Sequence, residues 1–389
     1  MKKLILLLLI TLINCGNELS EYRYTPPLNI NDELNTGTLE EVQMDIPLIS
    51  KTIEKIKSGK FNDIHSILIY KEDKLVLEEY FNGHQYQWNA PKYHGEIVQW
   101  KKETMHPIMS CTKSITSACI GIAIDKGFIA NVQDKITDYL PGYKGLLTNG
   151  KEEITIEHLL TMTSGLEWDE WSTPHGTSAN DIDRLYLVCS DDPVRCILEK
   201  KLLHQPGETF TYNGGGIIVL GEILKSATGM DIREFSQKHL FKPLRIEKVQ
   251  WRQFNNGVFA TDGSIQLQPR DMLKIGIVYL NNGTWKDKLV ISKEWIAKSS
   301  VVYANNHGIN LPIEDSGKNG YSYTWWTSEL KHNGNIVKMY RAGGWGGQSI
   351  MVFHDLNMVI VFTGGNYASR SKLYRLIKNY VLPSIKIYE

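Results

Sequence analysis

The hydrophobic and polar positions along the chain predict strands at both ends and helices between them. Apolar residues recur at helical spacing over 46–58, and the two apolar runs that follow, 66–70 and 75–81, are typical of strands joined by a polar turn. Helical patterns then prevail from residue 110 to about residue 295. Strand patterns return over 321–327, 336–341, 348–353 and 358–363, before a last predicted helix over 369–380.

Two segments without periodicity border and interrupt the helical middle of the chain. Residues 84–107 are predicted to form an irregular loop, and the polar, aromatic-rich segment over 165–191 could form a lid over a site. Pro193 and Pro269 fit the first turn of a helix. The helices of this middle region are predicted over 156–162, 193–200, 216–227, 232–240, 269–280 and 293–299.

Strands from both ends of the chain are most simply joined in one sheet. We therefore predict an α+β fold with a central antiparallel sheet built from both chain ends, flanked by the two terminal helices, with a helical lobe inserted. The sheet lobe would comprise about 41–100 and 320–389, and the helical lobe about 101–319. A small-molecule site is expected in the cleft between the lobes.

The first residues have the layout of a signal peptide, which we place at 1–14. Two lysines precede an apolar run from residue 4 to residue 13 that is too short to span a bilayer. The run ends at Leu-Ile-Asn-Cys15-Gly, which resembles a bacterial lipobox and predicts lipidation of Cys15. Residues 15–40 would then be a tether, and the protein would be exported to the periplasm or cell envelope as a lipid-anchored protein. The alternative is an ordinary secretory signal with a chance cysteine.

The composition excludes some partners and leaves others open. Basic and acidic residues balance at 43 each, so nothing indicates nucleic acid as a partner. Cys111 and Cys119 are expected in the core, whereas Cys189 and Cys196 are close enough in sequence to form a small disulfide. No spacing resembles a metal site, and no cofactor is expected. The oligomeric state stays open.

The helix predicted to begin at Ser110 carries the most informative chemistry. Residues three apart share one face of a helix, so Ser110 and Lys113 should lie side by side at its amino end. A lysine can take the proton of a serine hydroxyl when burial or a neighbouring cation lowers its pKa. The serine N–H, unpaired at the helix start, can hold an oxyanion. The alternative is that Ser110 is a plain helix cap and Lys113 a solvated residue.

Two glycine-rich stretches could complete such a site. Tyr212 lies in the stretch 210–216, where its hydroxyl could relay a proton if a nearby cation lowers its pKa. The stretch 341–348 lies between two predicted strands, and its glycines allow a ligand to approach the backbone closely. The alternatives are a surface tyrosine in a turn and a bulged hairpin connection.

Together, the three stretches resemble the serine β-lactamase and penicillin-binding-protein superfamily. They are most similar to its class C-related esterases and amide hydrolases, including the 6-aminohexanoate-dimer hydrolases. The resemblance covers about residue 46 to the end of the chain. It is carried by the order and spacing of MSCTKSITSACIGIAIDKGFI, ITIEHLLTMTSGLEWDE, PGETFTYNGGGIIVLGEIL, LFKPLRIEKVQW, QPRDMLKIGIVYLNNGTW and RAGGWGGQ.

The resemblance implies roles for individual residues. Ser110, in Ser-x-x-Lys, would be the acylated nucleophile, and Lys113 would support removal of its proton. Tyr212, in the Tyr-x-Asn position, would act as base and return the proton to the leaving group. The third motif falls on 342–344, so Gly344 would border the site, and the N–H of Trp345 would join that of Ser110 in an oxyanion hole.

Two departures from the family pattern bear on the substrate. The asparagine of Tyr-x-Asn is Gly214 here, and the Lys or His of the third motif is Ala342. The side chains that help β-lactamases hold a substrate amide and carboxylate are therefore missing, although Arg341 could supply a charge. Trp345, with Trp168 from the lid, would instead offer apolar surface.

We accordingly expect a serine hydrolase that cleaves an ester or a short amide of a small acyl substrate through an acyl-enzyme on Ser110. A β-lactamase or peptidoglycan DD-peptidase is the enzymatic alternative. A non-catalytic binding or sensor protein on the same fold is the alternative of another class. The intact set of Ser110, Lys113 and Tyr212 argues against that last reading.

Overall fold

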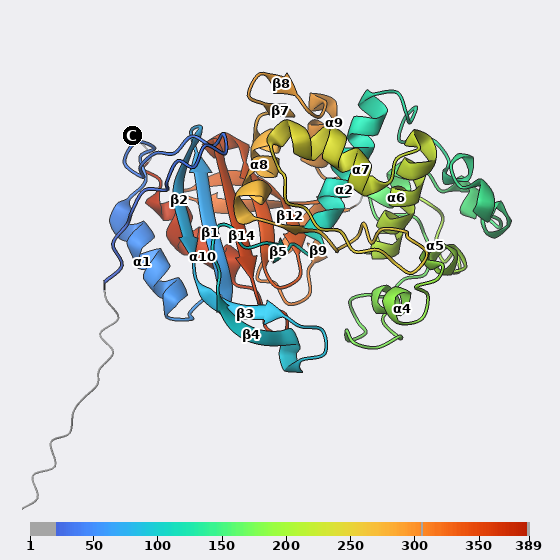
Figure 1. Ribbon diagram of the computed structural model, residues 1–389, viewed down its shortest axis with the longest axis horizontal. Coiled ribbons are helices and arrows are strands. Elements are labelled where there is room, and N and C mark those ends of the chain that lie inside the picture. The colour runs from blue at the N-terminus through green and yellow to red at the C-terminus, as the bar shows by residue number, and fades with distance from the viewer. Residues whose placement is uncertain (1–20, 305, 387–389) are drawn as a thin grey trace, which may run out of the picture.

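One antiparallel sheet of eight strands forms the centre of the computed structural model, which describes residues 21–304 and 306–386 (Figure 1). The strand order is β2-β1-β14-β13-β12-β11-β10-β9, so the two strands from the start of the chain pair directly with the strands from its end. The predicted α+β fold with a sheet built from both ends is therefore confirmed. The strands are β1 Ile64–Lys71, β2 Lys74–Tyr80, β9 Ile309–Asn310, β10 Lys318–Ser322, β11 Trp325–His332, β12 Asn335–Gly344, β13 Gln348–Phe353 and β14 Met358–Gly364.

The two strands that join the chain ends, β1 and β14, lie inside the sheet next to the edge strand β2 and are buried on both faces. Ile67 of β1 pairs with Phe362 of β14, and every residue of both strands is buried. Continuous apolar runs of β-branched residues suit such a position.

One predicted strand, over 321–327, is in fact the end of β10 and the start of β11. Tyr323 and Thr324 have positive φ angles and form the turn between them.

Each face of the sheet is covered by a separate hydrophobic core. On one face, α1 (Ile46–Lys57) packs beside the terminal helix, which begins as α10 (Leu373–Leu376) and continues in irregular turns to Ser384. On the other face, α8 (Pro269–Leu280) and the helical lobe form the larger core. The two terminal helices thus flank the sheet as predicted. The helix α8, however, lies against β13 and β14, although its sequence position falls inside the predicted helical lobe.

The remaining helices form a lobe at one side of the sheet (Figure 1). Two long helices, α2 and α6, pack against each other at its centre. The sequence predicted most of these helices within a few residues; α7 is shorter than expected, because the chain widens into a π turn after Ser236. The elements are α2 Cys111–Asp125, α3 Ile156–Leu160, α4 Asp181–Leu187, α5 Pro193–Leu198, α6 Gly214–Thr228, α7 Ile232–Ser236 and α9 Lys293–Ser299. Short pairs β5 (His106–Pro107) with β6 (Gln266–Leu267), and β7 (Thr284–Trp285) with β8 (Lys288–Leu289), connect them.

Two segments are more ordered than their sequences indicated. Residues 84–107, expected as an irregular loop, contain the hairpin of β3 (Asn82–Tyr86) and β4 (His94–Gln99). Within the predicted tether, residues 21–40 run along β2, where Leu34 and Leu39 are buried. The apolar residues spaced along this otherwise polar segment are the sequence feature that indicates its packing on the sheet. The predicted signal peptide and Cys15 lie outside the described residues.

Two of the four cysteines among the described residues form a disulfide, and the other two are free. Cys189 and Cys196 form a disulfide, which closes the end of α4 onto α5. Cys111 and Cys119 are free and buried in the core around α2. Among residues 21–304 and 306–386, no helix is both long enough and apolar enough to cross a bilayer.

Candidate active site

Ser110 lies at the turn from β5 into α2. Met109 before it has a φ of 48°, and Ser110 is the first residue with helical dihedrals, so the chain bends sharply at the serine. Its hydroxyl does not cap the helix. The Ser110 Oγ instead lies 2.9 Å from the Lys113 Nζ, so the predicted contact one helical turn apart is present.

Lys113 is buried and held from two sides. Its Nζ also donates a hydrogen bond to the backbone oxygen of Asp262, at 2.9 Å, and the residue is only 2% exposed. The neighbouring hydroxyl of Ser114 donates to the backbone oxygen of Thr324 instead. Of the two serines nearest Lys113 on this helix, only Ser110 therefore presents its hydroxyl to the ammonium.

Tyr212 reaches the same place from the start of α6. Asn213 caps that helix by accepting a hydrogen bond from the Gly216 N–H, and the backbone N–H of Thr211 donates to Met162. These bonds fix the segment that carries the tyrosine. The Tyr212 side chain lies beside both residues: Lys113 and Ser110 each lower the pKa of its hydroxyl, and the Lys113 Nζ lies 5.1 Å from the ring centroid. The structure thus brings all three predicted catalytic residues together.

A fourth ionisable side chain, Glu170, belongs to the site and was not singled out from the sequence. Its Oε2 accepts hydrogen bonds from the Trp168 Nε1, at 2.6 Å, and from the Gly214 N–H, at 2.8 Å. A Cβ added at Gly214 would lie 2.9 Å from this oxygen, so the carboxylate occupies the space of the missing side chain. Nothing in the sequence distinguishes Glu170 from the acidic residue beside it, Asp169. The Asp169 carboxylate accepts hydrogen bonds from Ser172 and Thr173 of the same loop.

Burial and charge set the protonation of these groups. Burial raises the pKa of the Tyr212 hydroxyl and of the Glu170 carboxyl. Burial alone would lower the pKa of Lys113, but Tyr212, Glu170 and Asp262 together raise it. The lowered lysine pKa expected from the sequence is therefore wrong: the surrounding acidic groups outweigh desolvation. The resting pair is a lysine ammonium beside a neutral phenol.

The end of β12 lies directly beside the nucleophile turn. A Cβ added at Gly344 would lie 2.5 Å from the backbone oxygen of Ile108, two residues before Ser110, so only glycine allows this approach. Ala342 is fully buried on the same side of the strand. Trp345 follows the strand, and its ring stacks on that of His175 at 4.5 Å. The predicted third motif is thus adjacent to Ser110.

Arg341 does not reach this site. It is buried, forms an ion pair with Glu314, and donates a hydrogen bond to the Tyr374 hydroxyl of the terminal helix at 3.0 Å. Alternate residues of a strand point to opposite faces, which directs Arg341 away from the side of Ala342. The sequence-based suggestion that it could supply a substrate-binding charge is not supported.

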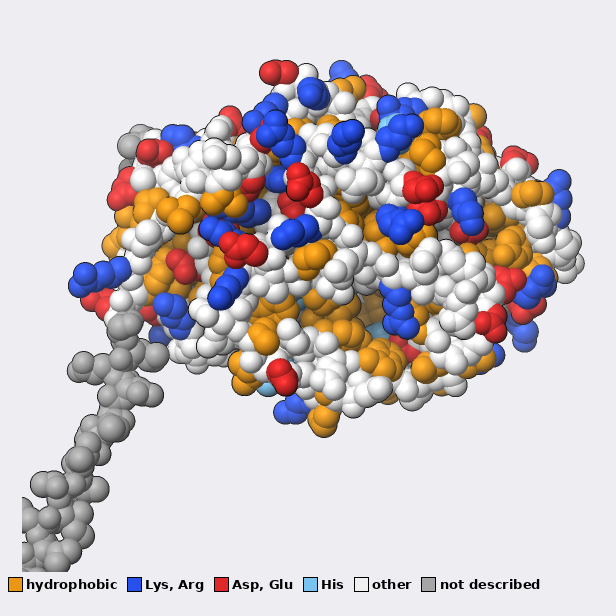
Figure 2. Space-filling model, viewed as in Figure 1, with side chains coloured by type: hydrophobic (Ala, Val, Ile, Leu, Met, Phe, Trp, Pro, Cys, Tyr) orange, Lys and Arg blue, Asp and Glu red, His pale blue; other side chains and the backbone are white. Residues whose placement is uncertain are grey.

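Aromatic side chains surround the nucleophile. Trp171, 37% exposed, stacks on Tyr212 with ring centroids 4.8 Å apart. Trp168, predicted to line the site, is instead buried behind it, against Gly215 at the start of α6. The lid also meets the β3–β4 hairpin, because the Tyr93 hydroxyl donates to the backbone oxygen of His175. Figure 2 shows the surface hollowed between this hairpin and the helical lobe, with apolar side chains around the hollow.

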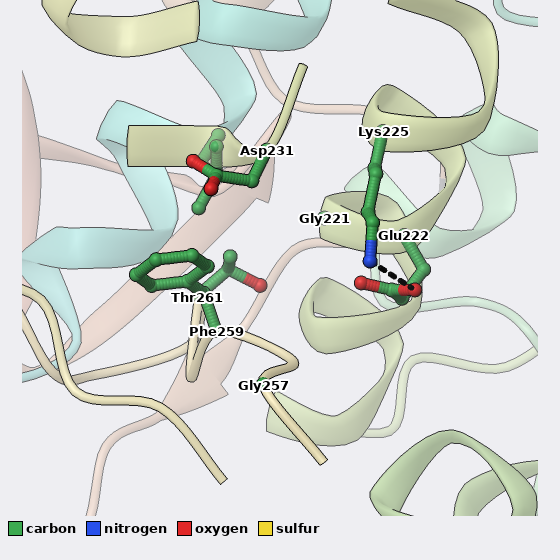
Figure 3. A pocket seen from close by; sticks show the side chains of 8 residues that line it. Gly221, Glu222, Lys225, Asp231, Gly257, Phe259 and Thr261 are labelled. Carbon is green, nitrogen blue, oxygen red and sulfur yellow. Dashed lines mark ion pairs between the residues drawn. The ribbon is translucent and has the colours of Figure 1, made fainter. Parts of the chain in front are cut away.

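A separate pocket lies on the outer side of α6 (Figure 3). None of the candidate catalytic residues lines it, and its polar side chains include the ion pair of Glu222 with Lys225. We assign it no role in the reaction. Among the described residues, no group of three His, Cys, Asp or Glu side chains could hold a metal ion.

A two-lobed fold with a Ser-Lys-Tyr cluster between a sheet and a helical lobe is that of the β-lactamase-related serine hydrolases. The Beta-lactamase family model matches residues 65–380, and the chain belongs to this family. Protein flp of Staphylococcus aureus (strain MW2) is 31% identical over 190 residues, 49% of this chain and 35% of that protein. An N-acetylmuramyl-L-alanine amidase of Bacillus subtilis (strain 168) is 24% identical over 228 residues, 58% of this chain and 50% of that protein. The chain thus spans half or less of the length of these two relatives.

Solved structures share the fold at low sequence identity. A protein assigned as a 6-aminohexanoate-dimer hydrolase from Bacillus anthracis matches with a TM-score of 0.67 and 19% identity, over 84% of this chain and 80% of that one. EstCE1, a hydrolase with promiscuous acyltransferase activity, matches with a TM-score of 0.64 and 14% identity, over 86% of this chain and 99% of that one. Esterases, amide hydrolases and penicillin-binding-protein homologues therefore all share this architecture.

Proposed function

We propose that the protein hydrolyses an ester or short amide through an acyl-enzyme on Ser110. The observation that carries this proposal is the hydrogen bond between the Ser110 hydroxyl and the buried Lys113, with the Tyr212 ring beside the same ammonium. A part-exposed nucleophile beside a buried lysine and a partly buried tyrosine is the arrangement that covalent acyl transfer needs.

In the first step, Ser110 Oγ bonds to the substrate carbonyl carbon and its proton passes to the Tyr212–Lys113 pair. The pair accepts this proton only after losing one of its own, because its resting form is an ammonium beside a phenol. The N–H groups of Ser110 and Trp345 would hold the oxyanion. As the bond to the leaving group breaks, the pair returns the proton to that group. Water then repeats the sequence on the acyl-enzyme and releases the acid.

The substrate is proposed to have a neutral or apolar acyl group. Ala342 and Gly214 offer neither a charge nor an amide, and Arg341 is committed to Glu314. Trp171 and Trp345 add aromatic surface on either side. A missing charge-assisted hydrogen bond is worth roughly 1.5–3 kcal/mol, which corresponds to about tenfold to a hundredfold in rate. Short-chain esters should thus be cleaved best, then linear amides, and β-lactams poorly.

A comparison of kcat/KM for a neutral short-chain ester and a cephalosporin tests this order. A clear preference for the ester supports the proposal, and comparable values would favour the β-lactamase alternative. Release of D-alanine from a peptidoglycan peptide would favour the DD-peptidase. Labelling by a fluorophosphonate probe separates all of these from a non-catalytic binding protein, which would not react.

We further propose that the enzyme works outside the cytoplasm, attached to a membrane through lipid on Cys15. The support is the lipobox-like sequence and the disulfide of Cys189 with Cys196, since disulfides persist in oxidising compartments. Mass spectrometry of the mature amino terminus from native membranes tests this. An unmodified start at another residue would contradict it.

A further inference from the structure

One face of this electrically balanced chain is enriched in basic residues and poor in acidic ones. The segments 46–60 and 370–386 together contain nine basic residues and one acidic residue, Glu54, whereas the whole chain has 43 of each kind. We name this surface, formed by α1 and the terminal helix, the basic face. Its basic residues are Lys51, Lys55, Lys57, Lys60, Arg370, Lys372, Arg375, Lys378 and Lys386.

The two segments of the basic face lie side by side. Phe61, which follows α1, packs edge-on against Tyr380 with ring centroids 5.5 Å apart, and the Lys60 Nζ donates to the Tyr380 hydroxyl at 2.9 Å. The Lys372 Nζ donates to the side chain of Asn62 at 2.8 Å. Lys60, Lys55 and Lys51 all lower the pKa of the partly buried Tyr380, so their charges act on the same place.

These charges are not neutralised within the described part of the protein. None of the nine basic side chains forms a salt bridge with a described residue. Three carboxylates near these segments are otherwise engaged: Asp45 caps α1, Asp315 accepts backbone N–H groups of the terminal helix, and Glu79 accepts the Tyr22 hydroxyl. The basic face therefore presents an unpaired positive field to solvent.

The described chain starts beside this face. Lys57 of α1 lies over the ring of Tyr22, at 4.9 Å from its centroid, and Figure 1 shows the coloured chain beginning next to α1. Six peptide units separate Cys15 from Glu21, and they can span at most about 20 Å. If Cys15 carries the lipid, the bilayer surface must lie within that distance of Glu21, which adjoins the Tyr22 side chain under Lys57.

We propose that the basic face binds the anionic phospholipid surface of the membrane to which the protein is anchored. A lipid chain and a basic patch act together in membrane attachment, because each cationic side chain near an anionic surface adds attraction. Ser110 and α2 belong to the core on the opposite face of the sheet. Docking in this way turns the active site away from the lipid, toward substrates in the aqueous compartment. This inference rests on the proposed lipid anchor at Cys15 but does not depend on the proposed hydrolase activity.

The test measures binding of the full chain carrying Cys15→Ser to vesicles of phosphatidylcholine alone or mixed with phosphatidylglycerol. Binding should require the anionic lipid and fall with added salt. Each lost charge should lower the partition coefficient about fivefold, so the triple variant K51Q/K55Q/K378Q should bind about a hundredfold less. The matched control K238Q/K248Q/K288Q removes three exposed lysines from elsewhere and should bind like the parent.

Three results would overturn the proposal. Equal binding to neutral and anionic vesicles would show that charge is not involved. An equal loss in the control variant would show that only net charge matters. Failure of the parent to bind anionic vesicles at low salt would show that the basic face has no affinity for lipid. Circular dichroism of both triple variants checks that they are folded, and the salt dependence of the parent tests the proposal without any substitution.

Discussion

Replacing Glu170 with Gln should change the pH dependence of the enzyme rather than its fold. The amide oxygen of Gln can still accept hydrogen bonds from Trp168 Nε1 and the Gly214 N–H, which now lie at 2.6 and 2.8 Å from the carboxylate. What is lost is the negative charge of the buried carboxylate, whose ionised form is favoured by Lys113 and by these two hydrogen bonds and opposed by burial. That charge raises the pKa of both Lys113 and Tyr212, so it holds a proton on the pair that must accept one from Ser110.

The direction of the effect follows from the same contacts. The active form of the pair has one proton fewer than the resting form, so kcat/KM should rise as pH passes the pKa of the pair. Without Glu170 that pKa falls, and the rising limb should move to lower pH. At pH values below the rising limb, kcat/KM of the variant should exceed that of the parent about tenfold for each pH unit by which the limb moves. Glu170→Ala instead leaves two buried donors unpaired, at about 1–3 kcal/mol each in the free energy of unfolding.

The assay is the pH profile of kcat/KM for a neutral ester, with urea unfolding of each variant alongside. Trp168→Phe is the control, because it removes one hydrogen bond to Glu170 while leaving its charge. This control should lower stability and leave the limb in place. A limb that stays fixed in Glu170→Gln, or moves to higher pH, would refute the assignment of Glu170 to the proton-transfer pair.

Three further predictions concern other parts of the molecule. Ser110→Ala should abolish fluorophosphonate labelling and lower kcat by a factor on the order of 10⁶, and the losses in Lys113→Ala and Tyr212→Phe should not add; residual labelling at another serine would contradict this. In membranes washed at high salt, which screens the basic face, Cys15→Ser should move active enzyme from the membrane fraction to the soluble fraction; retention of an unlipidated protein under these conditions would argue against the anchor. Burial lowers the pKa of His106 to about 3, so the unfolded chain alone takes up its proton below about pH 6.5. Stability should therefore fall by up to about 1.4 kcal/mol per pH unit as pH drops from about 6.5 toward 3, and His106→Phe should show a shallower fall in urea unfolding.

The sequence predicts those parts of the fold that repeat a simple pattern. The helices α8 and α9 begin and end where the periodicity places them, and β13 does so as well. Ser110 and Lys113 could be paired from sequence because one helical turn fixes their separation. Tyr212 could be added only through the family resemblance, because nothing local says which side of the α6 start it faces.

The parts that could not be predicted depend on contacts between distant segments. Trp168 and Trp171 are three residues apart in one lid, yet one is buried behind Glu170 and the other stacks on Tyr212. The lysine pKa was expected to fall because burial was considered without the acidic neighbours. Those neighbours, Glu170 and Asp262, come from loops whose approach to Lys113 leaves no periodic signal in the sequence.

The absence of a side chain at Gly214 is best understood together with the presence of Glu170. An added Cβ would lie 2.9 Å from the Glu170 carboxylate and 3.0 Å from the side chain of Ile182, so one of them must move. Gly214→Ala should therefore displace the carboxylate from the N–H that holds it, lower stability, and shift the rising limb of the pH profile to lower pH, as Glu170→Gln does. Because the two substitutions act on one contact, the double variant should show clearly less than the sum of the single shifts. Additive shifts would mean that Gly214 and Glu170 act independently, and that the glycine is only a lost substrate-binding position.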